Sequence, residues 1–470
     1  MTSAGRTAAS SELADAATHG TGLVRALGAW DGALITIGAM LGSGIFLTTS
    51  DIARRLPHSG LIIVLWLAGG ALTLAGALAY AELGAMFPRA GGPYHYLKEA
   101  YGSFWAFLYG WTSFLIIMSG GVATIAVGFG EYLQAFVQLT DLHLGSLTVR
   151  GSQLAAAMGI AFLTGVNYLG VRQGAWVQNL ATGIKVLALV GLATVGLLVP
   201  PVVAPHWFAP LPAGSLVAGL GLGMVAVLWT YDGWYVATFE AGEMRSPARD
   251  LPRSLVIGVT AVVALYVLIN CVYLRALSPE EIGRTPRIGE AAAGALLGPV
   301  GARLAAALIL VATFGCLAAN ILCCARIYLP MAQDGLFFHA LARIHPRYRT
   351  PGASLVAQGV WSAVLALSGT FEQLYTWVVF ASVLFQGAVG AAVFVLRRTR
   401  PEQPRPYRTW GHPWVTGAFV LSCLALTAVT LAQSPRESLF GVALMVSGVP
   451  AFLWWRRRSR TLSSAQRPMA

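Results

Sequence analysis

The chain has 470 residues, of which 56% are hydrophobic and only 11% are charged. Soluble globular proteins carry about 25% charged residues, so no soluble fold of this length could cover its surface with so few. The formal net charge of +12 is spread over connecting segments and the C-terminus rather than gathered on one basic face, which argues against nucleic-acid binding.

Residues 1–24 are rich in Ala, Ser and Thr and lack the apolar core of a secretory signal, which predicts a disordered cytoplasmic tail. Beyond this tail, apolar runs follow one another along the chain. Crossing the hydrocarbon core takes about 20 residues, and backbone groups in lipid must pair within the segment, so these runs predict helices. We predict an all-α integral membrane protein with 12 transmembrane helices, at roughly 29–51, 60–86, 101–136, 152–171, 174–199, 214–240, 252–274, 299–330, 354–370, 373–396, 413–432 and 438–455.

Local features refine this assignment. The run at 101–136 is longer than one span needs, so we expect it to include an interfacial turn. The run at 174–199 ends at Pro200-Pro201, which cannot continue a helix. The five cysteines lie inside apolar runs with neither metal-ligand spacing nor a disulfide framework, so we expect them to be packing residues.

The positively charged residues indicate the orientation, because Lys and Arg are enriched in cytoplasmic loops. With the N-terminus placed in the cytoplasm, most of the 31 Lys and Arg fall on the cytoplasmic side, including those of the basic tail at 456–470. We therefore predict a multi-pass protein of the inner or plasma membrane with both termini in the cytoplasm.

Two of the predicted helices contain breaks. The first run holds Gly42-Ser43-Gly44, and the sixth holds Asp232-Gly233. A restarting helix exposes N–H groups that attract a carboxylate, and a stopped helix exposes carbonyls that accept bonds from an ammonium. A lone Gly-Ser-Gly is more often a packing face. Two breaks five helices apart instead favour a binding site for a zwitterion at the middle of an inverted repeat.

The ordered motifs carry a family resemblance that runs from about residue 25 to 455. They are 38–46 (GAMLGSGIF), 80–84 (YAELG), 88–94 (PRAGGPY), 231–234 (YDGW), 242–252 (GEMRSPARDLP), 326–328 (RIY), 334–335 (DG), 349–351 (RTP) and 405–407 (RPY). In this order and spacing they resemble the amino acid–polyamine–organocation superfamily, and within it the L-type amino acid transporter branch.

The resemblance implies a fold of five plus five helices in inverted repeat, with discontinuous helices one and six and two additional C-terminal helices. The first repeat would cover residues 25–200 and the second residues 214–396. Residues 397–455 would hold the last two helices. The family also implies an amino acid permease rather than an enzyme, working by alternating access without a cofactor or metal.

The resemblance further implies that substrate lies between the two broken helices. Backbone N–H groups around Ser43, Gly44 and Ile45 would hold the carboxylate. The amino group would be held by carbonyls near Met40, Trp229, Thr230 and Asp232, and Trp229 would also form an aromatic gate. Gly120 and Gly121 fall where the family lines the side-chain pocket, although close helix packing explains them equally well. The predicted substrate-binding residues are Met40, Gly42, Ser43, Gly44, Ile45, Gly120, Gly121, Trp229, Thr230, Asp232 and Gly233.

Lys185 lies deep in an apolar run, where an ammonium costs about 2.5–3.5 kcal/mol on insertion scales. Snorkelling to an interface is the alternative explanation, but the lysine lies far from either end of the run. The resemblance implies that it replaces the sodium ion of related transporters and bonds to the first-helix break. We therefore expect sodium-independent transport. Desolvation would also let this amine release a proton, which would permit proton coupling.

Several other residues leave alternatives open. Asp232 either caps the restarting half-helix or faces the substrate ammonium. Glu82 and Glu243 lie near cytoplasmic helix ends with several arginines close in sequence, which favours interfacial charge pairs over an inner gate. Glu240 receives no role. Tyr235 stands where animal members commonly have Asn, which weakens substrate inference from them.

The function predicted is a secondary transporter of L-amino acids, with neutral and bulky ones favoured, by exchange or proton symport. The alternatives are a cationic amino acid or polyamine antiporter, and an amino-acid-sensing receptor that does not transport. The loop at 136–151 has no cysteine, so we expect no disulfide-linked heavy subunit. The expected partners are the amino acid and the lipid bilayer, with homo-oligomers allowed and no nucleic acid.

Overall fold

A computed structural model describes residues 27–89, 91–144, 147–169, 171–211, 216–345 and 350–465. Within these ranges the chain is helical apart from a short hairpin, in which β1 (Leu142–Leu144) pairs antiparallel with β2 (Leu147–Val149). The predicted tail at 1–24 and the last residues of the predicted tail at 456–470 lie outside the described residues.

The helices follow the predicted runs in order. In the first half they are α2 (Ala29–Met40), α3 (Thr48–Arg55), α4 (Ser59–Met86), α5 (Pro93–Tyr101), α6 (Ser103–Thr112), α7 (Met118–Leu133), α8 (Gly151–Leu169) and α9 (Val171–Leu198). In the second half they are α10 (Leu216–Tyr231), α11 (Pro247–Ala276), α12 (Pro279–Arg284), α13 (Ile288–Cys324), α14 (Tyr328–Gln333), α15 (Gly352–Ser368), α16 (Phe371–Thr399), α17 (Trp414–Gln433), α18 (Pro435–Val446) and α19 (Gly448–Ala465).

Eight helical stretches of the described chain are long and apolar enough to cross a membrane, which supports the predicted multi-span fold. Two shorter apolar stretches, Thr182–Leu198 and Gly352–Ser368, fall in the predicted runs at 174–199 and 354–370. The first predicted run is divided between α2 and α3, and neither piece is long enough to span a membrane by itself. The count of 12 spans stays a prediction.

Local chemistry sets several helix boundaries. His58 caps α4 by accepting the Leu61 N–H on Nδ1 at 3.2 Å. Thr370 caps α16 in the same way, in a capping box with Gln373. Within α13, Gly298 and Pro299 interrupt the helix, so that α13 consists of two helices joined at a kink. These caps and kinks end elements at positions that hydrophobicity alone does not mark.

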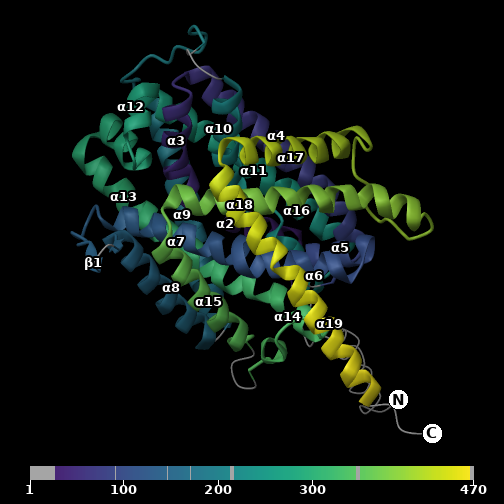
Figure 1. Cartoon of the computed structure of the whole chain (residues 1–470). Coiled ribbons are helices and arrows are strands. Elements are labelled where there is room, and N and C mark those ends of the chain that lie inside the picture. The colour runs from purple at the N-terminus through teal and green to yellow at the C-terminus, as the bar shows by residue number, and fades with distance from the viewer. Residues whose placement is uncertain are drawn as a thin grey trace, which may run out of the picture.

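The broken helices lie inside the bundle. α2 packs against α11, α9 and α13, α3 packs against α10 and α12, and α10 packs against α4 and α16. α7 contacts α8, α13, α15 and α16. Figure 1 shows α16 and α17 running side by side, with their connection projecting at the right of the view. The ends of α2 and α10 are therefore enclosed by neighbouring helices.

Candidate functional site

The first break lies where the sequence predicts it. α2 ends at Met40, Leu41 leaves helical geometry with φ −72° and ψ 75°, and a 3₁₀ turn at Gly44–Phe46 leads into α3. The first hydrogen bond of this turn joins the Phe46 N–H to the Ser43 carbonyl at 3.1 Å. Helix geometry leaves the preceding amides, those of Gly44 and Ile45, without an intrahelical acceptor. The break therefore presents N–H groups of the kind that bind a carboxylate.

The second break follows Tyr231, the last residue of α10. Gly233 has a φ of 94°, which a side chain would disfavour, and a 3₁₀ helix then runs from Val236 to Glu243. The chain thus leaves the α-helix at the predicted Asp232-Gly233 and resumes a helical path with tighter geometry.

The two breaks touch each other. A Cβ added to Gly233 would lie 2.9 Å from the Ala39 carbonyl oxygen. A Cβ added to Gly44 would lie 2.7 Å from Thr230 Oγ1 and 2.9 Å from Thr230 Cα. Just beyond this contact, the hydroxyls of Thr48 and Thr230 share a hydrogen bond of 2.6 Å. Glycine at both positions is what allows the two backbones to approach this closely.

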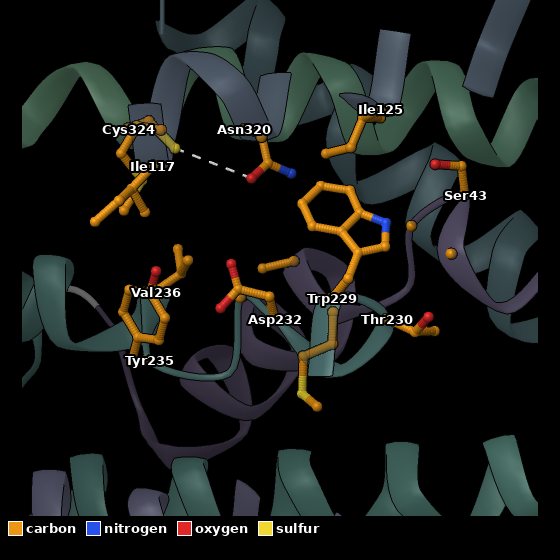
Figure 2. Close-up of a pocket in the computed structure, with 17 residues that line it drawn as sticks. Ser43, Ile117, Ile125, Trp229, Thr230, Asp232, Tyr235, Val236, Asn320 and Cys324 are labelled. Carbon is orange, nitrogen blue, oxygen red and sulfur yellow. Dashed lines mark hydrogen bonds between the residues drawn. The ribbon is translucent and has the colours of Figure 1, made fainter. Parts of the chain in front are cut away.

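A pocket lies between the breaks (Figure 2). Nine of the predicted binding residues line it: Met40, Gly42, Ser43, Gly44, Gly121, Trp229, Thr230, Asp232 and Gly233. The predicted Ile45 and Gly120 are not among its lining residues. A Cβ at Gly120 would point toward Val378, at 2.8 Å, whereas nothing lies within 4 Å of one at Gly121. The structure thus brings most of the predicted set together, and their binding role stays a prediction.

The sequence analysis missed several residues of this pocket. They are Ala39, Ile117, Met118, Ile125, Tyr235, Val236, Asn320 and Cys324. Asn320 donates to the Cys316 carbonyl at 2.9 Å, and the Cys324 thiol lies 3.9 Å from Asn320 Oδ1 (Figure 2). The signal that could have identified Asn320 is a polar amide inside the apolar run at 299–330, because intramembrane polar groups are costly and mark functional positions.

The polar groups at the two ends of the pocket differ in how they are paired. Ser43 Oγ and Trp229 Nε1 are buried without a hydrogen-bond partner among the described residues. Leaving such a group unpaired costs about 1–3 kcal/mol. The Met40 carbonyl already accepts bonds from the Gly42 N–H at 2.8 Å and the Tyr266 hydroxyl at 2.7 Å, which uses both of its lone pairs. Of the predicted carbonyl contacts, Thr230 and Asp232 are therefore better placed than Met40.

Asp232 lies beside Trp229 on the pocket wall (Figure 2). Its carboxylate accepts a hydrogen bond from the Gln386 amide at 3.2 Å. The N-cap position of the second half-helix is occupied by Tyr235 rather than by Asp232. This arrangement favours the expectation that Asp232 faces substrate over the expectation that it caps the helix.

Trp229 connects the pocket to a cluster of charges on α3 and α16. Its ring stacks on Tyr375 with centroids 6.4 Å apart and planes at 20°. The Tyr375 hydroxyl donates to Asp51 at 3.1 Å, and Arg55 pairs with Glu372. We call Asp51, Arg54, Arg55, Glu372 and Tyr375 the α3–α16 charge cluster. It ties the second half of the first broken helix to α16 on the far side of the indole.

Lys185 is 1% exposed, and its Nζ donates to the Gly38 carbonyl at 3.1 Å. Gly38 belongs to α2, two residues before its end, and a Cβ there would lie 2.9 Å from Thr182 Oγ1 of α9. The lysine therefore contacts α2 itself just before the break, and it does not line the pocket. It is buried inside the bundle, which disagrees with snorkelling to an interface.

The arginines that bind Glu82 come from a distant part of the chain and not from the nearby loops that the sequence analysis considered. Arg397 donates two hydrogen bonds to the Glu82 carboxylate, at 2.9 and 2.7 Å, and Arg405 Nε lies 3.6 Å from Glu82 Oε1. The Thr409 N–H adds a third hydrogen bond at 2.7 Å. The side chain of Glu82 is only 1% exposed, whereas that of Arg397 is 28% exposed, so a buried carboxylate joins α4 to α16 and to the α16–α17 connection. Sequence proximity could not identify these partners.

Comparison with known proteins gives concordant results. The family described as "Amino acid permease" matches residues 27–453. The chain is similar to the "Serine/threonine exchanger SteT" of Bacillus subtilis, with 29% identity over 94% of this chain and 99% of the relative. It is also similar to the human "b(0,+)-type amino acid transporter 1", at 28% over 91% and 87%, and to the human "Large neutral amino acids transporter small subunit 2", at 29% over 94% and 82%.

Proposed function

The chain belongs to the amino acid permease family, and we propose that it moves L-amino acids by alternating access, binding them between its two helix breaks. It is an amino acid transporter rather than an enzyme. The observation that carries the proposal is the contact between the breaks at Gly44–Thr230 and Gly233–Ala39, with the pocket beside it. The amides of the first break face the carboxylate, and the carbonyl ends of α10 accept the ammonium.

The proposal is tested by uptake of radiolabelled amino acids into liposomes that hold the purified protein. We expect uptake above that of empty liposomes, and competition by a subset of L-amino acids. Binding of the same amino acids without any uptake or exchange would favour the receptor alternative and contradict transport.

We propose neutral L-amino acids as the substrates, because the pocket wall on the α7 side is apolar, with Ile117, Met118 and Ile125. Gly121 leaves open space on the same side, since nothing lies within 4 Å of its Cβ position. A bulky apolar side chain would bury surface there at about 25 cal/mol per Å². The relatives are named as exchangers and transporters of several amino acid classes, so a panel of competitors decides the range.

A second candidate is a cationic amino acid, and the Asp232 carboxylate favours it. This carboxylate lines the pocket, and among the described residues it accepts a side-chain hydrogen bond from the neutral Gln386 amide. A cationic substrate side chain would give it an opposite charge. The test compares competitors of uptake in the native chain and in Asp232→Asn. If Lys or Arg competes in the native chain but not in Asp232→Asn, while competition by Leu is unchanged, the cationic candidate is established and the neutral one is displaced.

We propose that transport needs no sodium, because the Lys185 ammonium already supplies a positive charge to the Gly38 carbonyl of α2. Exchange and proton symport remain the two modes. Uptake that depends on internal amino acid and ignores a pH gradient indicates exchange, and uptake driven by an inward proton gradient indicates symport. A strict requirement for sodium would contradict this part of the proposal.

For the topology we propose 12 spans with both termini in the cytoplasm, built as five plus five helices and two more. The eight long apolar stretches, the two shorter ones and the divided first helix support this arrangement. Single cysteines placed at the two tails of a variant that lacks reactive native thiols should be labelled by an impermeant reagent only after the membrane is opened. Labelling of either tail from outside would overturn the orientation.

A further inference from the structure

A second concavity lies away from the substrate pocket, where the start of α11 meets the α16–α17 connection. Its walls include Arg249 and Arg253 on one side and Tyr407 on the other. Its floor is apolar, with Val256 and Ile257. None of these residues lines the substrate pocket. We call this concavity the α11 groove.

The two arginines of the α11 groove form a paired positive site. They lie four residues apart on α11, so they share one face of the helix, and both are exposed. In the part of the chain that the structure describes, no ion pair or hydrogen bond is recorded for either guanidinium. The neighbouring Asp250 accepts a bond from the Ser246 N–H at 3.1 Å instead. The groove thus offers two adjacent guanidinium groups to an anion.

The same face of α11 continues as an apolar stripe. Val256 and Ile257 follow the arginines along α11, and the exposed Ala264 and Leu268 come next; the Leu268 side chain is 43% exposed. From Arg253 to Leu268 the helix rises about 22 Å, enough to cover one leaflet of a hydrocarbon core of about 30 Å. α11 is also one of the stretches that can cross the membrane. A ligand with an anionic head and a long apolar tail therefore matches the groove and the stripe together.

We propose that the α11 groove binds an acidic phospholipid of the inner leaflet, with its phosphate between Arg249 and Arg253 and an acyl chain along the stripe. Basic pockets between membrane helices on the cytoplasmic side are suited to such headgroups. The choice of leaflet rests on the proposed topology, in which this end of α11 is cytoplasmic. A free phosphate shares the headgroup chemistry, but it would leave the apolar floor and stripe unmatched.

The bound lipid would also connect two elements. Tyr407 belongs to the same connection as Arg405 and Thr409, which contact Glu82 of α4. A phospholipid seated in the groove spans from α11 to this connection, so it ties α11 to the buried Glu82 carboxylate. Acidic lipid is thus expected to stabilise the full chain as well as to bind it.

The experiment measures how many lipids stay bound to the detergent-purified full chain by native mass spectrometry. Phosphatidylglycerol and phosphatidylcholine of the same acyl chains are titrated separately. Near an anionic membrane surface each Lys or Arg contributes about 1 kcal/mol, so the variant with both R249Q and R253Q should bind phosphatidylglycerol about tenfold or more weakly. The matched control removes two exposed arginines at the same proposed end, R343Q with R398Q, and should bind as the native chain does.

Two further variants separate the head and tail contributions. R249K with R253K keeps the charge and should retain most of the binding. Ile257→Trp leaves both arginines in place but fills the groove floor, and it should weaken phosphatidylglycerol binding by several-fold. Thermal unfolding midpoints show that each variant is folded, and transport need not be measured, so failure here is distinct from failure of the proposed function.

Three results would overturn the proposal. The first is equal retention of phosphatidylglycerol and phosphatidylcholine by the native chain. The second is unchanged phosphatidylglycerol binding in the R249Q and R253Q variant, or an equal loss in the control. The third is full displacement of the lipid by millimolar inorganic phosphate, which would indicate a site for a soluble anion.

Discussion

Adding one methyl group at Gly44 is expected to separate the two helix breaks. In Gly44→Ala the new Cβ would lie 2.7 Å from Thr230 Oγ1, 2.9 Å from Thr230 Cα and 3.0 Å from Thr230 Cβ. The hydroxyl is also bound to Thr48 and to the Ala226 carbonyl, so it has no free direction in which to move. Because Cα is backbone, the breaks must move apart by about 0.5–1 Å to reach ordinary carbon contact.

The expected cost follows from this displacement. Overpacking of this kind destabilises by about 1–3 kcal/mol, and misplacing binding groups by about 1 Å can reduce a rate about 100-fold. We therefore expect Gly44→Ala to lower the uptake rate in proteoliposomes by about 10- to 100-fold per molecule of inserted protein. The control is Gly165→Ala in α8, where nothing lies within 4 Å of the added Cβ.

Size-exclusion chromatography and the unfolding midpoint distinguish loss of folding from loss of transport. If Gly44→Ala is not folded, Thr230→Ala tests the same contact from the other side, because it removes the hydroxyl that lies beside Gly44 and bonds to Thr48, and we expect it to lower uptake as well. Uptake by a folded Gly44→Ala variant equal to that of Gly165→Ala would refute the reasoning, because the breaks would then not form the site.

The remaining predictions concern three charged contacts. Lys185→Ala removes the donor to the Gly38 carbonyl, and we expect uptake to fall at least tenfold with the protein still folded; normal uptake would deny the lysine a role in coupling. Glu82→Gln removes the carboxylate that Arg397 binds through two hydrogen bonds. The Arg397 side chain is 28% exposed, so the cost should stay below about 3–5 kcal/mol, the value for a fully buried pair. The thermal unfolding midpoint should still drop, and an unchanged midpoint would contradict a stabilising role for this contact. Glu372→Gln weakens the ion pair with Arg55, in which the Arg55 side chain is 30% exposed and the Glu372 side chain 41% exposed. Exposed pairs of this kind contribute about 1 kcal/mol or less, so affinity for external substrate should shift only two- to fivefold. Abolished uptake would assign Glu372 a larger role.

The positions of the helix breaks were predictable from the sequence because their chemistry is local. Gly42-Ser43-Gly44 and Asp232-Gly233 mark where a helix cannot continue normally, and the structure interrupts both helices there. Lys185 was equally visible, because a lysine inside an apolar run must find a partner. Its partner is the Gly38 carbonyl. Gly38 belongs to the first broken helix, as the sequence analysis expected, but it lies before the break and not within it.

Which face of a helix lines the pocket could not be predicted from one sequence. Successive residues of a helix point about 100° apart, so Gly120 and Gly121 face different neighbours, and only Gly121 reaches the pocket. A π-helical turn at Ser113–Ile117 shifts the register just before them. The mean apolarity of the run at 101–136 carries no sign of this turn.

Long-range polar contacts also could not be predicted from the sequence. Glu82 meets Arg397 and Asp51 meets Tyr375 across more than 300 residues of chain, and their distance in sequence gives no hint of contact. The sequence analysis instead considered the arginines nearest in the chain. The fold decides these pairs by bringing α16 against both α3 and α4.

The most direct measurement of the central claim is competition by amino acids that lack one of their two ends. For the best radiolabelled substrate, uptake is measured with excess unlabelled substrate, with its amide, which has no carboxylate, and with its N-acetyl form, which has no ammonium. If the two breaks bind the carboxylate and the ammonium of the substrate, the unmodified amino acid should compete fully, and each modified form should compete at least tenfold more weakly. Equal competition by either modified form would contradict the claim that the paired breaks bind both ends of the substrate.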